Sequence, residues 1–456
     1  MKKIILSFVI ISCVLNVSFS QTWTPLGSGM NNMVFSLTLF NNTLIAGGSF
    51  TTAGGDSANR IAKWNGANWS PIGSGMNDLI YSLTVYNNEL IAGGLFTTAG
   101  GESANRIAKW NGTNWSPIGS GVGGGSLPRV YALTVYNNEL IVGGVFTTAG
   151  GVSVNNIAKW NGTNWSPLGS GVGITEEVYA LTVYNNELIA GGAFIIAGGN
   201  TANMIAKWNG TTWSSLGSGM NLSVNALSVY NNELIAGGFF TTAGGVSANR
   251  IAKWNGTTWS PLGSGMGGVS SPFVTSLKIY NNDLIAGGKF KNAGGVSANY
   301  IAKWNGTTWS PLGSGMDFHV LALTIFDNYL IAGGNFSLAG VDSANNIAKW
   351  GLQTEVKTIN KNIPDKFYLH QSYPNPFNPV TKIKFDIPRW GGAGGWITTL
   401  QVFDVMGREV QTLVNERLQP GTYVVTFDGS DLSSGIYFYK LQTESYTDTK
   451  KMLLIK

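Results

Sequence analysis

The fold is decided by one stretch, residues 224–263, which reads V-N-A-L-S-V-Y-N-N-E-L-I-A-G-G-F-F-T-T-A-G-G-V-S-A-N-R-I-A-K-W-N-G-T-T-W-S-P-L-G. Asn225–Tyr230 and Glu233–Phe240 are β-prone runs separated by Asn231-Asn232, a dipeptide that favours a turn. A loop, Thr241–Asn249, follows. Two further runs, Ile251–Trp254 and Thr258–Leu262, flank Asn255-Gly256, the strongest short hairpin signal. Four short strands without a 3.6-residue periodicity exclude a helical repeat.

This stretch recurs along the chain, and its tryptophans measure the period. Seven tryptophans close an I-A-K-W segment, with successive spacings of 46, 50, 48, 46, 50 and 46 residues: Trp64, Trp110, Trp160, Trp208, Trp254, Trp304 and Trp350. A period of this length with four strands per unit is typical of a β-propeller blade. We therefore expect an all-β fold with seven blades over residues 21–350.

The ends of the repeat are offset from each other. Trp23 opens a W-T-P-L segment with no I-A-K-W before it, and Trp350 closes an I-A-K-W with no W-S-P-L after it. We expect Trp23–Leu26 to pair with Ile347–Trp350, so that one blade combines strands from both ends and closes the ring. Closure protects sheet edges that would otherwise recruit other chains.

Each repeat also carries L-I-[AV]-G-G followed by x-Phe, as in Leu44–Phe50. The glycine doublet, the aromatic residue and the tryptophan of the fourth strand resemble the kelch family of propellers over residues 21–350. Kelch repeats usually carry Tyr where this chain has Lys253-Trp254, which is a departure from the family pattern.

Residues 1–20 are predicted to be a signal peptide. Lys2 and Lys3 precede the apolar run Ile4–Ile11, and Ser18-Phe19-Ser20 provides small residues for cleavage before Gln21. The alternative is a lipoprotein signal, I-I-S-C, that would make Cys13 an acylated anchor. Cys13 is the single cysteine, so a processed chain would have no disulfide and no thiolate site. No other segment is apolar for long enough to be a transmembrane segment.

After Trp350 the repeat ends and the sequence pattern changes. Residues 351–366 are expected to be a linker, and residues 367–456 a small antiparallel β-sandwich with strands at Thr381–Ile387, Thr399–Val405, Gly421–Phe427, Gly435–Gln442 and Lys450–Ile455. Between the first two strands, Arg389–Trp396 (R-W-G-G-A-G-G-W) is expected to be a loop decoration that leaves the core intact.

Residues 367–456 closely resemble the type A C-terminal sorting domain of the type IX secretion system of Bacteroidota. The resemblance rests on Y-P-N-P-F-N-P, D-V-M-G-R-E-V, S-G-I-Y-F-Y and the final T-K-K-M-L-L-I-K. It implies export through the outer membrane of a Gram-negative bacterium, to the cell surface or the medium, with the secretion machinery as a partner. The motif positions are Tyr373, Pro374, Asn375, Pro376, Phe377, Asn378, Pro379, Gly407, Arg408, Gly435 and Tyr437.

Charge argues against a nucleic-acid partner. Residues 21–350 hold 14 Lys or Arg and 13 Asp or Glu, a net charge of +1. The recurrent lysines, such as Lys253, occur once per repeat, so they form no basic stripe.

Catalytic residues are scarce as well. The chain has two histidines, His319 and His370, and no nucleophile–base pair can be assigned. We expect no enzyme activity, no metal and no cofactor. Glu176-Glu177 is expected to be a solvated loop charge.

A ligand-binding surface is the remaining expectation. The hairpin turns hardly vary between repeats, whereas the loops that join repeats do vary: Gly123–Arg129, Gly173–Glu177, Gly267–Phe273 and Asp317–His319. One uniform face and one varied face suggest that a monomeric propeller binds a glycan or protein on the varied face. Drift at unconstrained loop tips explains the same pattern, and a polysaccharide hydrolase or lyase, or a purely structural role, are the alternatives. The candidate ligand-binding residues are Arg60, Arg106, Arg129, Arg250, Tyr300, Phe318 and His319.

Overall fold

The computed structural model describes residues 21–456 except residues 174–175, 353–356, 361–362, 390–394 and 431. The predicted signal peptide and Cys13 lie outside the described residues. All regular secondary structure in the described part consists of β-strands, which confirms the expected all-β class. The search for a helix long and apolar enough to cross a bilayer, made over the described residues, found none.

Residues 21–352, here called the repeat domain, contain seven four-stranded antiparallel sheets. In the fifth, β27 (Val224–Tyr230), β28 (Glu233–Gly238), β31 (Ile251–Trp254) and β32 (Trp259–Pro261) pair in sequence order. The second strand ends two residues earlier than expected, since Phe240 turns into the core and is fully buried. The expected loop after it holds a two-residue ladder, β29 (Thr242–Ala243) with β30 (Val246–Ser247).

The other sheets repeat this plan, and are called repeats 1 to 7 in the order of their innermost strands. The innermost strands are β2 (Val34–Phe40), β8 (Ile80–Tyr86), β15 (Arg129–Tyr136), β21 (Glu177–Tyr184), β27, β34 (Phe273–Tyr280) and β40 (Val320–Phe326). The second strands are β3 (Thr43–Gly48), β9 (Glu89–Gly94), β16 (Glu139–Val145), β22 (Glu187–Ala193), β28, β35 (Asp283–Lys289) and β41 (Tyr329–Gly334).

The outer half of each sheet is short. The third strands are β6 (Ile61–Trp64), β12 (Ile107–Trp110), β19 (Ile157–Trp160), β25 (Ile205–Trp208), β31, β38 (Ile301–Trp304) and β44 (Ile347–Leu352). The outer strands are β7 (Trp69–Pro71), β13 (Trp115–Pro117), β20 (Trp165–Pro167), β26 (Trp213–Ser215), β32, β39 (Trp309–Pro311) and β1 (Gln21–Pro25).

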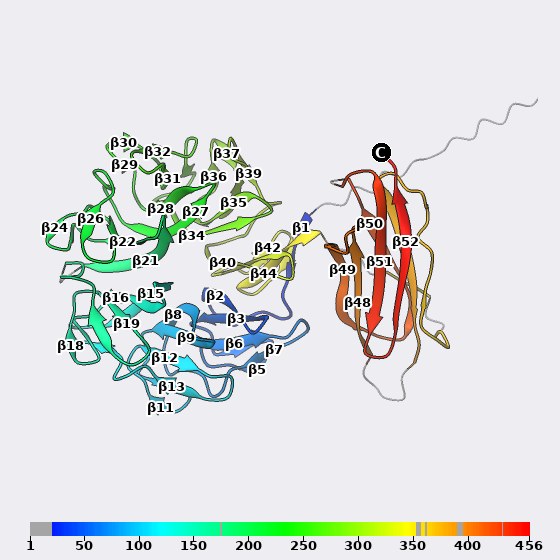
Figure 1. Ribbon diagram of the computed structural model, residues 1–456, viewed down its shortest axis with the longest axis horizontal. Helices are drawn as coiled ribbons and strands as arrows, with labels where there is room; N and C mark the ends of the chain where they lie inside the picture. Colours follow the sequence, from blue (N-terminus) through cyan, green and yellow to red (C-terminus); the bar gives the residue numbers. More distant parts are fainter. Residues whose placement is uncertain (1–20, 174–175, 353–356, 361–362, 390–394, 431) are drawn as a thin grey trace, which may run out of the picture.

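The seventh sheet joins the two ends of the repeat domain. β1 pairs with β44, and Trp23 lies opposite Trp350, in the register that Trp259 and Trp254 have inside repeat 5. Each innermost strand contacts the next one, and β40 contacts β2. Figure 1 shows the sheets arranged around a central opening, with β1 and β44 side by side.

Tryptophans connect neighbouring repeats. In each sheet the two tryptophans pack with ring centroids 5.3–5.4 Å apart, as Trp254 and Trp259 do. The indole N–H of Trp259 donates to Leu216 O of the preceding repeat at 2.9 Å. Trp23 makes the same bond to Leu312 O at 2.9 Å across the chain ends. Large buried rings with a satisfied N–H stabilise each sheet-to-sheet contact.

The invariant asparagine before each third strand bonds the Gly-Ser-Gly turn that follows the outer strand of the sheet. Asn249 Nδ2 donates to Ser264 O at 3.1 Å, and Asn345 Nδ2 donates to Ser28 O at 3.0 Å. Both bonds bring a side-chain amide to the carbonyl of the Gly-Ser-Gly turn. The same set of bonds therefore serves inside the repeats and at the junction of β1 with β44.

The C-terminal domain is a two-layer sandwich. One sheet has the order β45 (Lys357–Asn360), β50 (Gly421–Asp428), β47 (Val380–Ile387), β46 (Tyr368–Leu369). The other has the order β49 (Glu409–Leu418), β48 (Trp396–Phe403), β51 (Gly435–Thr443), β52 (Thr447–Leu454). The inward residues alternate along the strands, as a half-buried sheet requires.

Three features of this domain differ from expectation. β45 lies inside the segment expected to be a linker and pairs with β50. β49 was not expected, because its sequence is polar and alternates weakly. Trp396 belongs to the core with 8% exposure rather than to a loop decoration, since its indole N–H bonds Pro388 O at 3.1 Å; residues 390–394 of that segment lie outside the described residues.

The Y-P-N-P-F-N-P motif anchors the last strand. Phe377 is buried, and its N–H donates to Leu453 O at 2.9 Å. Asn375 Oδ1 accepts the Leu453 N–H at 2.8 Å. Arg408 Nε donates to Asp404 at 2.7 Å, and Tyr437 donates to Ser433 O at 2.9 Å. The Phe377 and Asn375 bonds tie the motif to β52, whereas the Arg408 and Tyr437 bonds are local, each to a residue four positions earlier.

Candidate functional site

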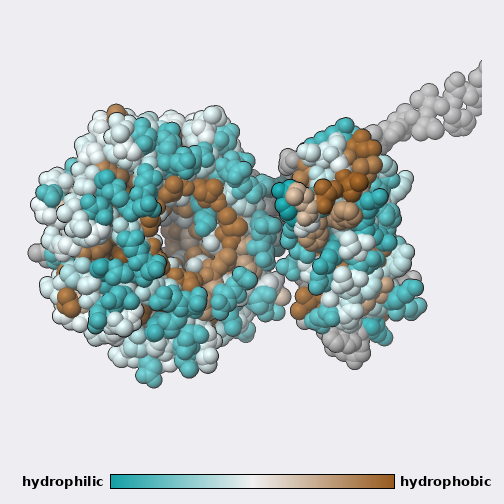
Figure 2. Space-filling model, viewed as in Figure 1, coloured by the Kyte–Doolittle hydropathy of each residue, from teal (hydrophilic) through white to brown (hydrophobic). Residues whose placement is uncertain are grey.

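The repeat domain has two chemically different ends. The innermost strands all begin at one end, here called the loop end, where the loops between repeats lie. They all finish at the other end, the turn end, where the Asn-Asn and Asn-Gly turns lie. Figure 2 shows hydrophobic residues gathered around the central opening, which the innermost strands border.

Every innermost strand is bulged near its start at the loop end. The pairing of β15 with β16 shifts between Val130 and Ala132, which leaves Tyr131 without a partner in the ladder. The same shift occurs in all seven repeats. A bulge re-aims one side chain, and bulges are frequent beside functional sites. The bulged residues are Phe35, Tyr81, Tyr131, Tyr179, Asn225, Thr275 and Leu321.

Four consecutive bulges carry aromatic rings, here called the aromatic arc (Phe35, Tyr81, Tyr131 and Tyr179). Centroids of neighbouring rings are 5.5, 5.1 and 5.2 Å apart in that order. All four side chains are half-buried. The arc is a continuous aromatic surface across four repeats, and aromatic surfaces stack on flat apolar faces of ligands.

An ion pair lies beside the arc. Arg129 Nη2 is 3.6 Å from Glu177 Oε1, and the Arg129 guanidinium lies 5.3 Å from the Tyr131 ring centroid. The Arg129 Nε is buried and has no hydrogen-bond partner within the part of the chain that the structure describes. Glu177 is therefore paired rather than a solvated loop charge, and Glu176 accepts the Ile195 N–H at 3.0 Å. The expectation for these two glutamates was wrong, because the loop folds back onto the next strand.

The pKa values of the three tyrosine hydroxyls in the arc are raised. Burial, and next Glu177, raise the pKa of Tyr131 to about 12. Burial and the hydrogen bond to Glu177 raise the pKa of Tyr179, and burial raises that of Tyr81. Tyrosine hydroxyls are neutral at physiological pH, and these shifts move their ionisation further above it.

A second group on the same end is the aromatic–lysine cluster (Phe273, Lys289, Lys291, Tyr300, Phe318 and His319). Phe318 and His319 stack at 3.9 Å between centroids, and Tyr300 lies 5.8 Å from His319. Phe273 is 5.5 Å from His319. The structure therefore brings three of the sequence-predicted residues, Tyr300, Phe318 and His319, into one contact group.

His319 is held neutral within this cluster. Burial, and next the charge of Lys289, lower its pKa. Its Nε2 is buried and has no hydrogen-bond partner among the described residues.

The other predicted arginines do not converge. Arg60 Nη1 donates to Ser49 O at 2.6 Å, Arg106 Nη1 to Leu95 O at 2.8 Å, and Arg250 Nη1 to Phe239 O at 2.5 Å. Each satisfies a backbone carbonyl of its own repeat. Arg60, Arg106 and Arg250 therefore serve the loop backbone first, while Arg129 belongs to the arc.

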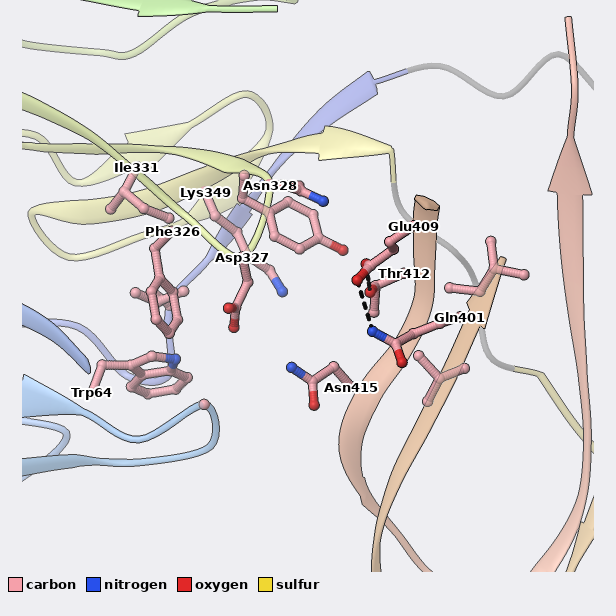
Figure 3. A pocket seen from close by; sticks show the side chains of 15 residues that line it. Trp64, Phe326, Asp327, Asn328, Ile331, Lys349, Gln401, Glu409, Thr412 and Asn415 are labelled. Carbon is pink, nitrogen blue, oxygen red and sulfur yellow. Dashed lines mark hydrogen bonds between the residues drawn. The ribbon is translucent and has the colours of Figure 1, made fainter. Parts of the chain in front are cut away.

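An open pocket of about 440 Å³ lies at the turn end, against the C-terminal domain. Figure 3 shows Asp327 and Lys349 on one side, with Gln401, Glu409 and Asn415 on the other. Burial raises the pKa of Asp327, and Lys349 partly offsets this. Glu409 already accepts from Gln401 Nε2 at 2.9 Å. The pocket presents two carboxyls, those of Asp327 and Glu409, beside Lys349 and several side-chain amides.

Sequence reasoning located the cluster but missed the aromatic arc. Its signal was available: an aromatic residue precedes [SA]-L-T at one position in four successive repeats. The signal does not by itself show that these side chains meet, because neighbouring positions are about 50 residues apart in the sequence. Across the described residues, no three His, Cys, Asp or Glu side chains come together as metal ligands.

The search of curated proteins found no similar sequence. A solved structure of a fungal alcohol oxidase of the AA5 family, in complex with copper, is similar over 96% of this chain and 100% of its own, at 11% identity and a TM-score of 0.41. Residues 371–456 match the family described as the secretion system C-terminal sorting domain. This confirms the sorting domain inferred from the sequence motifs, and it indicates type IX export to the cell surface or the extracellular space.

Proposed function

We propose that this chain is a secreted or surface-displayed, non-catalytic binding protein whose ligand is a glycan held at the loop end. Residues 21–352 act as a rigid seven-bladed, kelch-like propeller, closed by β1 on β44 and monomeric. The C-terminal domain engages the type IX machinery and delivers the propeller outside the cell.

The aromatic arc is the observation that carries the proposal. Four rings within 5.5 Å of their neighbours offer successive stacking surfaces along one line. Sugar rings have apolar faces that pack on aromatic rings, while Tyr hydroxyls and the Arg129–Glu177 pair supply hydrogen bonds to sugar hydroxyls. A polysaccharide can follow such a surface over several residues.

Two further features support binding over catalysis. The ionisable groups of the arc are paired or neutral, so none is poised as a general base at neutral pH. The loop-end positions vary between repeats on an unvarying backbone, as in binding surfaces built on rigid scaffolds.

The test uses residues 21–456 on an oligosaccharide array, followed by calorimetry with the best-bound sugar. Tyr131→Ala should weaken binding at least tenfold, because it removes the central stacking surface. Val135→Ala, on the same strand at the turn end, should leave affinity unchanged. Release of shortened sugar from the array would instead establish the hydrolase or lyase alternative, and binding to matrix proteins alone would replace the glycan by a protein partner.

A further inference from the structure

The basic residues of the repeat domain are unevenly neutralised. Of its 14 Lys and Arg, five recurrent lysines pair with acids at 2.8–3.2 Å, as Lys253 does with Glu233. Lys349 lies over the Tyr329 ring. Three arginines bond backbone carbonyls, and Arg129 pairs with Glu177.

Four lysines remain without an acidic partner within 4.0 Å among the described residues: Lys63, Lys278, Lys289 and Lys291. Three of them belong to repeat 6, and two of those, Lys289 and Lys291, lie at the loop end. Small or neutral residues hold the equivalent places elsewhere, such as Ser49 and Thr51 in repeat 1. Cations left uncompensated on one sector of a rim favour an anionic ligand there.

The same sector is aromatic. Lys291 Nζ lies 6.0 Å from the Tyr300 ring centroid, and Lys289 lies opposite Phe273 in the strand register. Phe318 is 43% exposed and stacks on His319. Charge without an acidic partner and exposed ring surface therefore occur together here, whereas Arg129 beside Tyr131 in the aromatic arc is paired with Glu177.

The backbone at Tyr300 is shared by all seven repeats. Its φ is +64°, and the equivalent residue is left-handed in every other repeat, including Arg60, Met204 and Arg250. This conformation therefore belongs to the scaffold, and the proposal rests on the lysines and the aromatic rings.

We propose that the aromatic–lysine cluster binds the carboxylates of an acidic glycan, so that the ligand of the loop end is a uronic-acid polysaccharide. Lys289 and Lys291 neutralise the carboxylates, and the exposed ring of Phe318 packs against the face of a sugar ring, supported from below by the buried Tyr300. The aromatic arc lies on the same loop end and offers neutral rings and hydroxyls to the ligand. This inference rests on the proposed function and names its ligand class.

The test compares two probes on residues 21–456: α-1,4-linked hexagalacturonate and its fully methyl-esterified form, which has the same rings without charge. The acid should bind at least tenfold more tightly, and its affinity should fall as salt is raised. The double variant Lys289→Gln/Lys291→Gln should remove this preference and leave binding of the ester unchanged.

Lys63→Gln is the matched control for the single variant Lys291→Gln, because both remove one unpaired lysine charge, at opposite ends of the domain. Equal effects of these two variants would overturn the inference. So would equal affinity for acid and ester; if Tyr131→Ala still weakened both, the glycan-binding function would stand without the acidic specificity. Failure of both probes to bind would also overturn it, and an array hit on a neutral glycan would then preserve the proposed function alone.

Discussion

The turn end and the loop end of the repeat domain are built on the same seven sheets, yet they differ in what is repeated. At the turn end nearly every residue recurs. Asn255 Oδ1 accepts the N–H groups of Thr257 and Thr258 at 2.9 and 2.8 Å, and the tryptophan pairs pack beside it. Such residues form hydrogen bonds with backbone groups, and their substitution leaves a backbone N–H without a partner.

At the loop end the backbone bonds recur and the side chains do not. Gly238 N–H bonds Arg250 O at 2.9 Å, as Gly144 N–H bonds Asn156 O at 3.0 Å. Some of the residues that vary stand on bulges, as Tyr131 does, or in left-handed positions, as Tyr300 does, and others lie in the loops, as Phe318 does. This scaffold therefore separates positions that hold the fold from positions open to a ligand.

The largest expected effect tests the junction of β1 and β44. Trp23→Ala should lower the free energy of unfolding by about 3–5 kcal/mol, because it removes a buried ring and its bond to Leu312 O. Trp309→Ala, in the same setting inside repeat 6, is the control, and both are measured by denaturant unfolding. A much smaller loss for Trp23→Ala would mean that the ends of the repeat domain are not joined as described.

A smaller effect separates the glycines of the two ends. A Cβ on Gly238 would lie 2.1 Å from Ser223 O at the loop end, whereas a Cβ on Gly256 at the turn end meets nothing within 4 Å. Gly238→Ala should cost about 2–3 kcal/mol, since backbone must shift. Gly256→Ala should cost about 1 kcal/mol, from its φ of +102° alone. Equal losses in denaturant unfolding would contradict the close approach at the bulge.

The smallest expected effect concerns Lys278, on β34 between the two ends. Six repeats have Thr or Ser at this position, and burial lowers the pKa of Lys278. The unfolded state therefore binds a proton at Lys278 more tightly than the folded state does. The free-energy cost of burying the charged Lys278 is complete below its folded-state pKa and disappears as the pH rises toward 10.5.

Lys278→Thr should accordingly stabilise the protein by about 0.5–1 kcal/mol at pH 7. The gain should shrink when unfolding is repeated near pH 10. A gain that stays constant across this range would show that Lys278 is not desolvated.

Much of this molecule followed from its sequence. The period, the Asn-Gly turns and the tryptophan pattern predicted strands close to those observed, because turn residues and β-prone runs act locally. The match over residues 371–456 confirmed the sorting domain, since its motifs recur in order. Tyr300, Phe318 and His319 were identified as candidates from their variation alone.

Only the tertiary structure decided which of the varied residues are free to meet a ligand. Arg60, Arg106 and Arg250 looked like candidates, but their guanidinium groups are used by backbone carbonyls within their own repeats. Phe35, Tyr81, Tyr131 and Tyr179 were not identified from the sequence, and a bulge in each strand brings their rings together in one arc. Repetition in the sequence specifies which elements form, because strand and turn preferences are local. The use of each side chain depends on partners that only folding brings close: carbonyls 11 residues away for the three arginines, and rings of the neighbouring repeat for the arc.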